Sequence, residues 1–270
     1  SSQIKAARAA LHYWEEPCIS GTRGSGAIFF SGCTLRCCFC QNYSISSATY
    51  GKEISEQKLA RIFLELQNQG AHNINLVTAT QYLPSILNAL DLVKNQLEIP
   101  VVYNSSGYEK PETIRLLKGY VDIYLPDLKY FSSELSRKYS KAEDYFEVAS
   151  CAIKLMIEQT GAPVFDSDGM LQKGVIVRHL VLPNCRKDSI SLLHWLKETL
   201  PDKHYLISLL SQYTPFYNSH KYPELNRRIT TYEYESILKE AISLGLVEGF
   251  MQEKSSAKEE YTPPFDLEGL

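Results

Sequence analysis

Four of the seven cysteines in this chain lie between positions 33 and 40. Three of them, Cys33, Cys37 and Cys40, have the spacing Cys-x3-Cys-x2-Cys. A structural 4Fe-4S cluster usually receives one cysteine thiolate on each of its irons. Three thiolates leave one iron open to bind another molecule. The spacing therefore predicts a 4Fe-4S cluster with an open iron at this loop.

Two other interpretations of the cysteines stay open. A tetrahedral zinc site normally uses paired Cys-x2-Cys hooks and a fourth ligand, and the second pair is missing here. Buried cysteines can also simply pack as small hydrophobic side chains. We expect such a packing or surface role for Cys18, Cys151 and Cys185, and we treat Cys38 as a bystander. Thiols crowded in this way make a poor disulfide framework, which indicates a reducing compartment.

The spacing, with Phe39 directly before the last cysteine, resembles the cluster-binding loop of the radical SAM superfamily. The resemblance implies that S-adenosylmethionine (SAM) binds the open iron through its amino and carboxylate groups. An electron from the reduced cluster then breaks the sulfonium bond and releases methionine and a 5'-deoxyadenosyl radical, which abstracts hydrogen from the substrate. The resemblance also places Phe39 near the adenine of SAM.

Residues 13–253 resemble the activating enzymes of glycyl radical enzymes, particularly pyruvate formate-lyase activating enzyme and proteins related to it. The match is clearest in residues 24–33, which run into the cysteine loop, and in residues 40–42, which leave it. This resemblance implies hydrogen abstraction from a glycine Cα in a protein or peptide substrate, such as a glycyl radical enzyme. It also implies a flavodoxin- or ferredoxin-type electron donor.

The residues that would meet SAM depart in part from the activase pattern. The activases have Gly-Gly-Glu after the second strand, where it meets the SAM amino group, but this chain has Thr78-Ala79-Thr80. In the next polar segment, which includes Ser106, Asn104 stands where the activases have an aspartate. A threonine hydroxyl accepts hydrogen bonds but lacks the negative charge that favours an ammonium group. We therefore expect Thr78, Thr80, Asn104 and Ser106 to contact SAM in an altered pocket.

Further SAM contacts are expected from later strand ends. Asp127 and Lys129 reproduce an Asp-x-Lys arrangement that lies beside SAM in the activases, and alternation along a strand end puts both on one face. Arg178 matches an activase arginine, which suits the SAM carboxylate because a guanidinium donates two parallel hydrogen bonds. Tyr213 stands where the activases have a ribose-contacting histidine. For the charged residues, a buried ion-pair network is the alternative. His179 should face away from Arg178, as a hydrogen-bonded histidine under the helices, and a catalytic histidine is the alternative.

Short apolar runs alternate with longer amphipathic ones from Gly26 onward, which is typical of repeated βα units and a parallel sheet. Strands are expected over residues 27–30, 74–77, 101–103, 121–125, 175–182 and 205–210. Helices are expected over residues 54–69, 84–96, 144–159, 188–200 and 231–244, with shorter ones near 111 and 133. We predict an α/β fold, a partial (β/α)6 TIM-like barrel with parallel strands. The barrel would cover residues 26–253, with an N-terminal extension (1–25) before it and a polar tail (254–270) after it. Because the chain starts without methionine, the extension is expected to be a truncated form of a longer segment or to carry residues of a processed tag.

The composition is that of an ordinary soluble protein, with 44% hydrophobic residues, 22% charged residues and a formal net charge of -3. The charges form no basic stripe that would neutralise phosphates, so no nucleic-acid partner is expected. No apolar run reaches the length of a membrane helix, so no membrane partner is expected and the cytoplasm is the expected compartment. Charged residues such as Glu15 and Glu16, at the expected barrel mouth, should be solvated.

Activation of a glycyl radical enzyme is the leading hypothesis from the sequence. A second hypothesis is radical modification of a small molecule or a different peptide, because the altered SAM motifs place the chain in an outlying branch. A third is a non-catalytic protein that uses the iron-sulfur cluster for electron transfer or structure.

Overall fold

The computed structural model describes residues 3–46, 50–252 and 262–270. These residues form one sheet with the strand order β10-β9-β8-β6-β5-β4-β2-β1-β3, and the two-residue strand β7 (Val164–Phe165) pairs with β8. From β2 to β10 every neighbouring pair in this order is parallel. The parallel strands are β2 (Ser25–Phe30), β4 (Ile74–Val77), β5 (Val101–Ser105), β6 (Ile123–Pro126), β8 (Leu171–Leu180), β9 (Leu206–Leu210) and β10 (Gly249–Met251).

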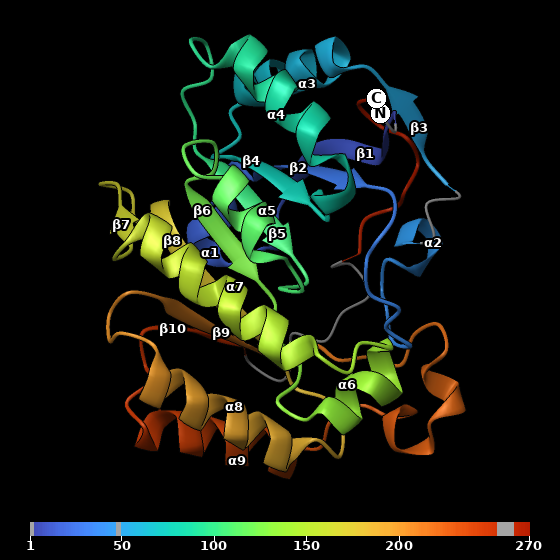
Figure 1. Ribbon diagram of the computed structural model, residues 1–270, viewed down its shortest axis with the longest axis vertical. Helices are drawn as coiled ribbons and strands as arrows, with labels where there is room; N and C mark the ends of the chain where they lie inside the picture. Colours follow the sequence, from blue (N-terminus) through green and yellow to red (C-terminus); the bar gives the residue numbers. More distant parts are fainter. Residues whose placement is uncertain (1–2, 47–49, 253–261) are drawn as a thin grey trace.

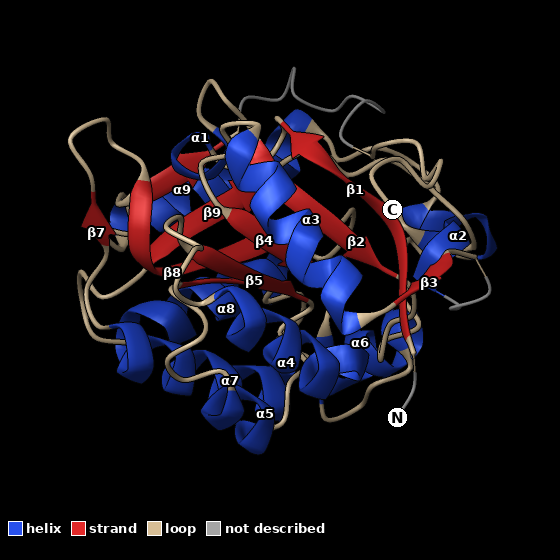
Figure 2. Ribbon diagram, turned by 90° about the horizontal axis from the view of Figure 1, so that it is seen from above, coloured by secondary structure: helices blue, strands red, loops and turns tan. Residues whose placement is uncertain are grey.

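Helices follow the parallel strands and cover the outer face of the curved sheet (Figures 1 and 2). In α3 the apolar residues Leu59, Ile62, Phe63 and Leu66 are buried, and the Ser55 side chain caps the first turn by accepting a bond from the Lys58 amide. No helix of the described residues is long and apolar enough to cross a membrane. The longer helices are α3 (Glu56–Asn68), α4 (Leu83–Val93), α5 (Pro111–Leu116), α6 (Ser133–Ser140), α7 (Tyr145–Thr160), α8 (Arg186–Thr199) and α9 (Thr231–Ser243).

The α/β partial barrel predicted from the sequence is confirmed. Each predicted strand corresponds to one of the parallel strands from β2 to β9, and each predicted helix to one of α3 to α9. The sequence pattern does not predict β10, because three partly exposed residues are too few to show a strand period.

The N-terminal residues belong to the same sheet as the barrel. β1 (Ile4–His12) pairs antiparallel with β2 on one side and with β3 (Lys52–Ile54) on the other. The short helix α1 (Pro17–Ser20) then places Cys18 and Ile19 among the apolar residues of the inner face, which include Val102, Ile123, Leu125, Ile176 and Leu206. The predicted division into extension, barrel and tail remains a prediction.

The C-terminal residues 262–270 lie beside β1, close to the N-terminus (Figure 1). The Leu267 amide donates to the Ala7 carbonyl at 3.1 Å, and the Ala9 amide donates to the Glu268 carbonyl at 2.8 Å. Phe265 packs its ring edge-on against Phe29, with 5.6 Å between the ring centroids. This segment therefore docks against the barrel, whereas residues 255–260, which we expect to be exposed, lie outside the described residues.

Candidate active site

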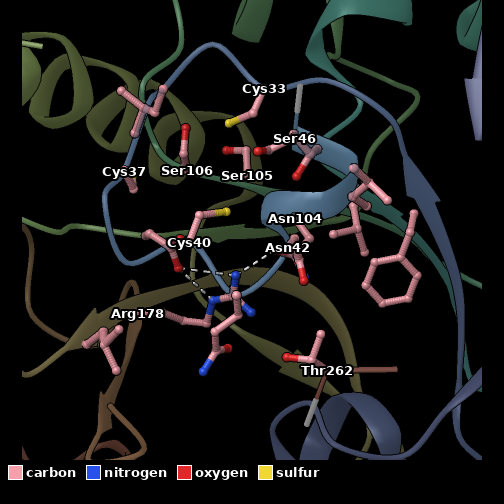
Figure 3. Close-up of a pocket in the computed structure, with 18 of the residues that line it drawn as sticks. Cys33, Cys37, Cys40, Asn42, Ser46, Asn104, Ser105, Ser106, Arg178 and Thr262 are labelled. Atoms are coloured by element: carbon pink, nitrogen blue, oxygen red, sulfur yellow. Dashed lines mark hydrogen bonds and ion pairs between the residues drawn. The ribbon is translucent and has the colours of Figure 1, made fainter. Parts of the chain in front are cut away.

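A pocket of about 240 Å³ opens at the carboxyl ends of the parallel strands. The cysteine loop after β2 forms one wall, and residues at the ends of β4, β5, β6 and β8 form another. Figure 3 shows the sulfur atoms of Cys33 and Cys40 pointing into the same space, with Asn104 and Arg178 beside it. The carboxyl edge of a parallel sheet is where ligands are bound in α/β barrels, so this pocket is the candidate active site.

The cysteine loop is held in place by hydrogen bonds with two other parts of the chain. Gln81 donates through Nε2 to the carbonyls of Ser31, Gly32 and Thr78, at 2.9, 3.2 and 3.0 Å. The Cys38 amide donates to the Tyr139 carbonyl of α6 at 2.8 Å. Gln81 thereby ties the start of the loop to the end of β4, and α6 supports its far side.

Cys33, Cys37 and Cys40 all line the pocket. Burial is the main cause that raises the pKa of each thiol, and the pKa of Cys40 reaches about 12. Such thiols keep their protons until iron binds them as thiolates. Ser140 donates to the Cys37 sulfur at 3.0 Å, as hydroxyl groups do to thiolate ligands. The donor set fits a 4Fe-4S cluster. The described lining of the pocket does not include Cys38.

The zinc alternative finds less support in this geometry. Within the described ranges, no three His, Cys, Asp or Glu side chains close around the position of a single metal ion. A cluster does not require such closeness, because each thiolate binds a different iron.

Arg178 is the centre of a network of charged and polar groups in the opposite wall. Its Nη1 donates to Glu15 at 3.0 Å, its Nη2 donates to Asn104 at 2.5 Å and its Nε donates to Asp127 at 3.2 Å. Lys129 donates to the other Asp127 oxygen at 2.6 Å. Burial raises the pKa of Asp127, but Lys129 and Arg178 outweigh it and hold this pKa below its usual value. Asp127 is therefore ionised, and the network contains fixed charges of both signs.

The structure brings most of the predicted contact residues together. Besides the three cysteines, the pocket is lined by Phe39, Thr78, Asn104, Ser106, Asp127, Lys129 and Arg178. Their common position follows from the sheet, since each comes from the end of a parallel strand or from the cysteine loop. Their roles toward SAM remain proposals.

Two predicted contacts, Thr80 and Tyr213, do not line the pocket. The Thr80 hydroxyl donates to Glu109 at 2.6 Å and also bonds the Tyr103 hydroxyl at 2.9 Å. Tyr213 is buried, and its hydroxyl donates to the Leu225 carbonyl at 2.8 Å while its ring packs edge-on against Phe39. Both side chains are thus engaged in other hydrogen bonds, and we exclude them from the proposed SAM site.

His179 takes the position that strand alternation predicts. It is buried away from the pocket, with Nδ1 bonded to the Leu128 carbonyl at 2.7 Å and Nε2 to the Ser189 hydroxyl at 2.8 Å. Burial lowers its pKa to about 4, so this histidine is neutral at physiological pH. The expectation of a hydrogen-bonded histidine under the helices is confirmed.

Glu15 and Glu16 are not the solvated residues that the sequence suggests. The Glu15 side chain is only 11% exposed and lines the pocket, where Asn75 and Asn104 donate to its Oε1 at 3.1 and 3.0 Å. Glu16 is buried, and the structure gives its Oε2 no hydrogen-bond partner among the described residues. The place of Glu15 in the site is not predicted from the sequence, because no local pattern shows that the turn after β1 enters the barrel.

Fold and site together define an α/β partial barrel with a cysteine loop at the carboxyl ends of its strands. The radical SAM superfamily matches this chain over residues 27–166, which include the three cysteines and the strands from β4 to β6. The chain belongs to the radical SAM superfamily, whose members use a 4Fe-4S cluster and SAM.

Individual proteins are also similar to this chain, one in sequence and others in fold. The chain is similar to the uncharacterized protein MJ0674 of Methanocaldococcus jannaschii, with 33% identity over 226 residues, 79% of this chain and 61% of that protein. It is similar in fold to SuiB of Streptococcus suis bound to SAM, with a TM-score of 0.56 and 13% identity over 87% of this chain and 52% of that one. SuiB bound to the precursor peptide SuiA gives a TM-score of 0.54 and 14% identity over 82% and 47% of the two chains. This chain therefore spans less than two thirds of each of these proteins.

Proposed function

We propose that this protein cleaves SAM reductively and directs hydrogen abstraction at a peptide or protein substrate, as a glycyl radical enzyme activase-like protein. The observation that carries the proposal is one pocket that holds three cysteine thiols and, opposite them, the Asn104, Asp127 and Arg178 network. The run of residues 24–33 into the cysteine loop, which resembles that of the activases, supports the activase role.

Cys33, Cys37 and Cys40 would hold the cluster. With SAM bound, the cluster supplies one-electron cleavage of the sulfonium bond, which yields the 5'-deoxyadenosyl radical for hydrogen abstraction. A small flavodoxin- or ferredoxin-type protein would deliver the electron. The protein's own part is to keep the three thiols on one loop, which Gln81 and α6 hold from two sides.

The polar wall of the pocket suits the methionine end of SAM. Among the described lining residues, Lys129 and Arg178 are the side chains with a permanent positive charge, and they suit a carboxylate. Thr78 and Ser106 add hydroxyl groups that can bond the ligand. The ring of Phe39 lies in the same lining, beside the last cysteine, which supports the expected contact with adenine.

The remaining part of the pocket suits an uncharged substrate group. Its lining includes the side chains of Trp14, Phe29, Leu180, Leu210 and Gln212. A peptide backbone around a glycine carries no charge and little bulk, so it would enter this region without a desolvated charge. That a fold relative, SuiB, binds a precursor peptide is in line with a peptide substrate.

The proposal is tested by measuring 5'-deoxyadenosine release from SAM by the anaerobically reconstituted and dithionite-reduced protein. We expect release by the wild type and none above background when Cys33, Cys37 and Cys40 are all changed to alanine. Cys38→Ala is the matched control, because Cys38 is outside the described pocket lining, and it should retain release. Equal release by the wild type and the triple variant would refute the proposal.

The activase role has its own measurement. With a glycyl radical enzyme added to the reduced protein and SAM, we expect a glycyl radical signal by electron paramagnetic resonance. SAM cleavage without such a signal, across several glycyl radical enzymes, would instead favour modification of a small molecule or another peptide.

A further inference from the structure

Two carboxylates face the pocket among the described lining residues, and their surroundings differ. Asp127 receives hydrogen bonds from two cations, Lys129 and Arg178. Glu15 receives a bond from one cation, Arg178, and its other bonds come from the neutral amides of Asn75 and Asn104. Glu15 is therefore the pocket carboxylate whose negative charge is less compensated, and its oxygens can accept a further hydrogen bond from a ligand.

The backbone around Glu15 fixes the position of this carboxylate. The Glu15 amide donates to the Ser20 hydroxyl at 3.0 Å, and that hydroxyl donates to the His12 carbonyl at 3.2 Å. These bonds close the turn between β1 and α1. The side chain is thus held at the pocket before any ligand arrives, so little conformational entropy is lost on binding.

Glu15 also stands beside a position where an acidic group is missing. Asn104 carries a neutral amide, and its Nδ2 donates to the Glu15 carboxylate at 3.0 Å. Thr78 and Thr80 are uncharged, and Thr80 bonds Glu109 and Tyr103 away from the pocket. The ends of β4 and β5 therefore supply no acidic side chain to the described pocket lining, and Glu15 of the N-terminal turn supplies one beside them.

We propose that the Glu15 carboxylate accepts a hydrogen bond from the α-amino group of the methionine moiety of SAM. An α-amino acid presents an amino group, which donates hydrogen bonds, and a carboxylate on the same carbon. The wall presents a complementary pair, because Arg178 Nη1 lies 3.0 Å from Glu15 Oε2 (the Arg178 and Asn104 part of this wall is shown in Figure 3). The inference rests on the proposed function, in which this pocket is the SAM site.

The test is the equilibrium dissociation constant, measured by anaerobic calorimetry on cluster-loaded protein, for two ligands. One is SAM, and the other is the SAM analogue in which hydrogen replaces the α-amino group. Glu15→Gln should weaken SAM binding by roughly tenfold to a hundredfold, the value of a charge-assisted hydrogen bond, and should leave the deaminated analogue within about twofold. The matched control is Glu16→Gln, an adjacent glutamate outside the described pocket lining, which should leave both ligands within about twofold.

Equal weakening of both ligands by Glu15→Gln would overturn the inference, because Glu15 would then act only by positioning Arg178. An unchanged affinity for SAM would overturn it as well. If Glu15→Gln does not fold or load its cluster, Glu15→Asp keeps the charge on a shorter side chain. It should weaken SAM severalfold more than the analogue, and equal effects on the two ligands would count against the inference. Absence of SAM binding by the wild type would instead contradict the proposed function.

Discussion

Cys37 differs from the other two pocket cysteines in the hydrogen bond that its sulfur receives. Ser140 donates to Cys37 Sγ at 3.0 Å, and the Tyr130 hydroxyl bonds the same serine at 2.7 Å. Both partners are buried, so water does not replace this bond easily. Hydrogen bonds to the sulfur ligands help to set the reduction potential of a cluster, because they stabilise its more negative, reduced state.

We predict that Ser140→Ala makes the reduction potential of the cluster more negative, because the reduced cluster loses this hydrogen bond. The measurement is a potentiometric titration followed by electron paramagnetic resonance. Ser136→Ala is the control, since this buried serine of the same helix donates to the Ser133 carbonyl and not to a cysteine. A potential that stays the same, or becomes more positive, would show that Ser140 does not stabilise the reduced cluster.

The C-terminal segment 262–270 contributes to the pocket wall and packs against β1 and β2. Thr262 lines the pocket, and Phe265 packs on Phe29, which lines it as well. Arg8 of β1 pairs with Asp266 at 2.7 Å and also with Glu268. Gly269 approaches β1 so closely that a Cβ atom there would lie 2.0 Å from the Ala9 carbonyl oxygen. Glycine at position 269 therefore allows the segment to pack this closely against β1.

We predict that Gly269→Ala releases this segment from β1. The substitution combines a left-handed backbone, φ +75°, which costs an L side chain about 1–2 kcal/mol, with the clash against Ala9. Hydrogen exchange should become faster in peptides that contain Ala9 and Leu267. Gly245→Ala is the control, because Gly245 has a similar φ of +73° and no atom within 4 Å of the added Cβ. Unchanged exchange at Ala9 in Gly269→Ala would contradict the prediction.

At the scale of the whole barrel, the buried acid Glu109 links two neighbouring βα units by a hydrogen bond. Glu109 follows β5, is almost fully buried, and accepts the hydrogen bond of Thr80, which follows β4. Burial raises the pKa of Glu109 from 4.5 to about 7, although the hydrogen bonds from Thr80 and Tyr103 oppose the shift. Because the folded protein favours the protonated acid, Glu109 stabilises the fold fully below pH 4.5. This stabilisation is lost as the pH rises through about 7.

We predict that Glu109→Gln stabilises the protein at pH 8.5 and has little effect at pH 5. The difference should be on the order of 3 kcal/mol, because glutamine cannot ionise in the same buried place. Thermal unfolding of the wild type and the variant at both pH values measures it. Glu112→Gln, at an exposed glutamate of α5, should show no such pH dependence. A Glu109→Gln effect that is equal at both pH values would mean that the acid does not titrate in this range.

The parallel α/β fold and much of the candidate site could be predicted from the sequence. Strand and helix periods are local, so α3 and the parallel strands β2, β4, β5, β6, β8 and β9 follow from the residues themselves. Asn104, Asp127 and Arg178 could be placed together from the resemblance to the activases, in keeping with parallel strands whose carboxyl ends meet at one edge. The Cys33, Cys37 and Cys40 spacing is likewise a local property of one loop.

Only the tertiary structure decided which side chains complete the pocket. Glu15 reaches Arg178 across 163 positions, and Ser140 reaches Cys37 across 103, so no local pattern reports either contact. Thr80 and Tyr213 follow predicted strands, but their hydroxyls bond groups away from the pocket. Thr80 donates to Glu109, and Tyr213 donates to the Leu225 carbonyl. A polar side chain points toward the donor or acceptor that packing brings within about 3 Å of it. That partner is often distant in the sequence, so it is determined only when the chain folds.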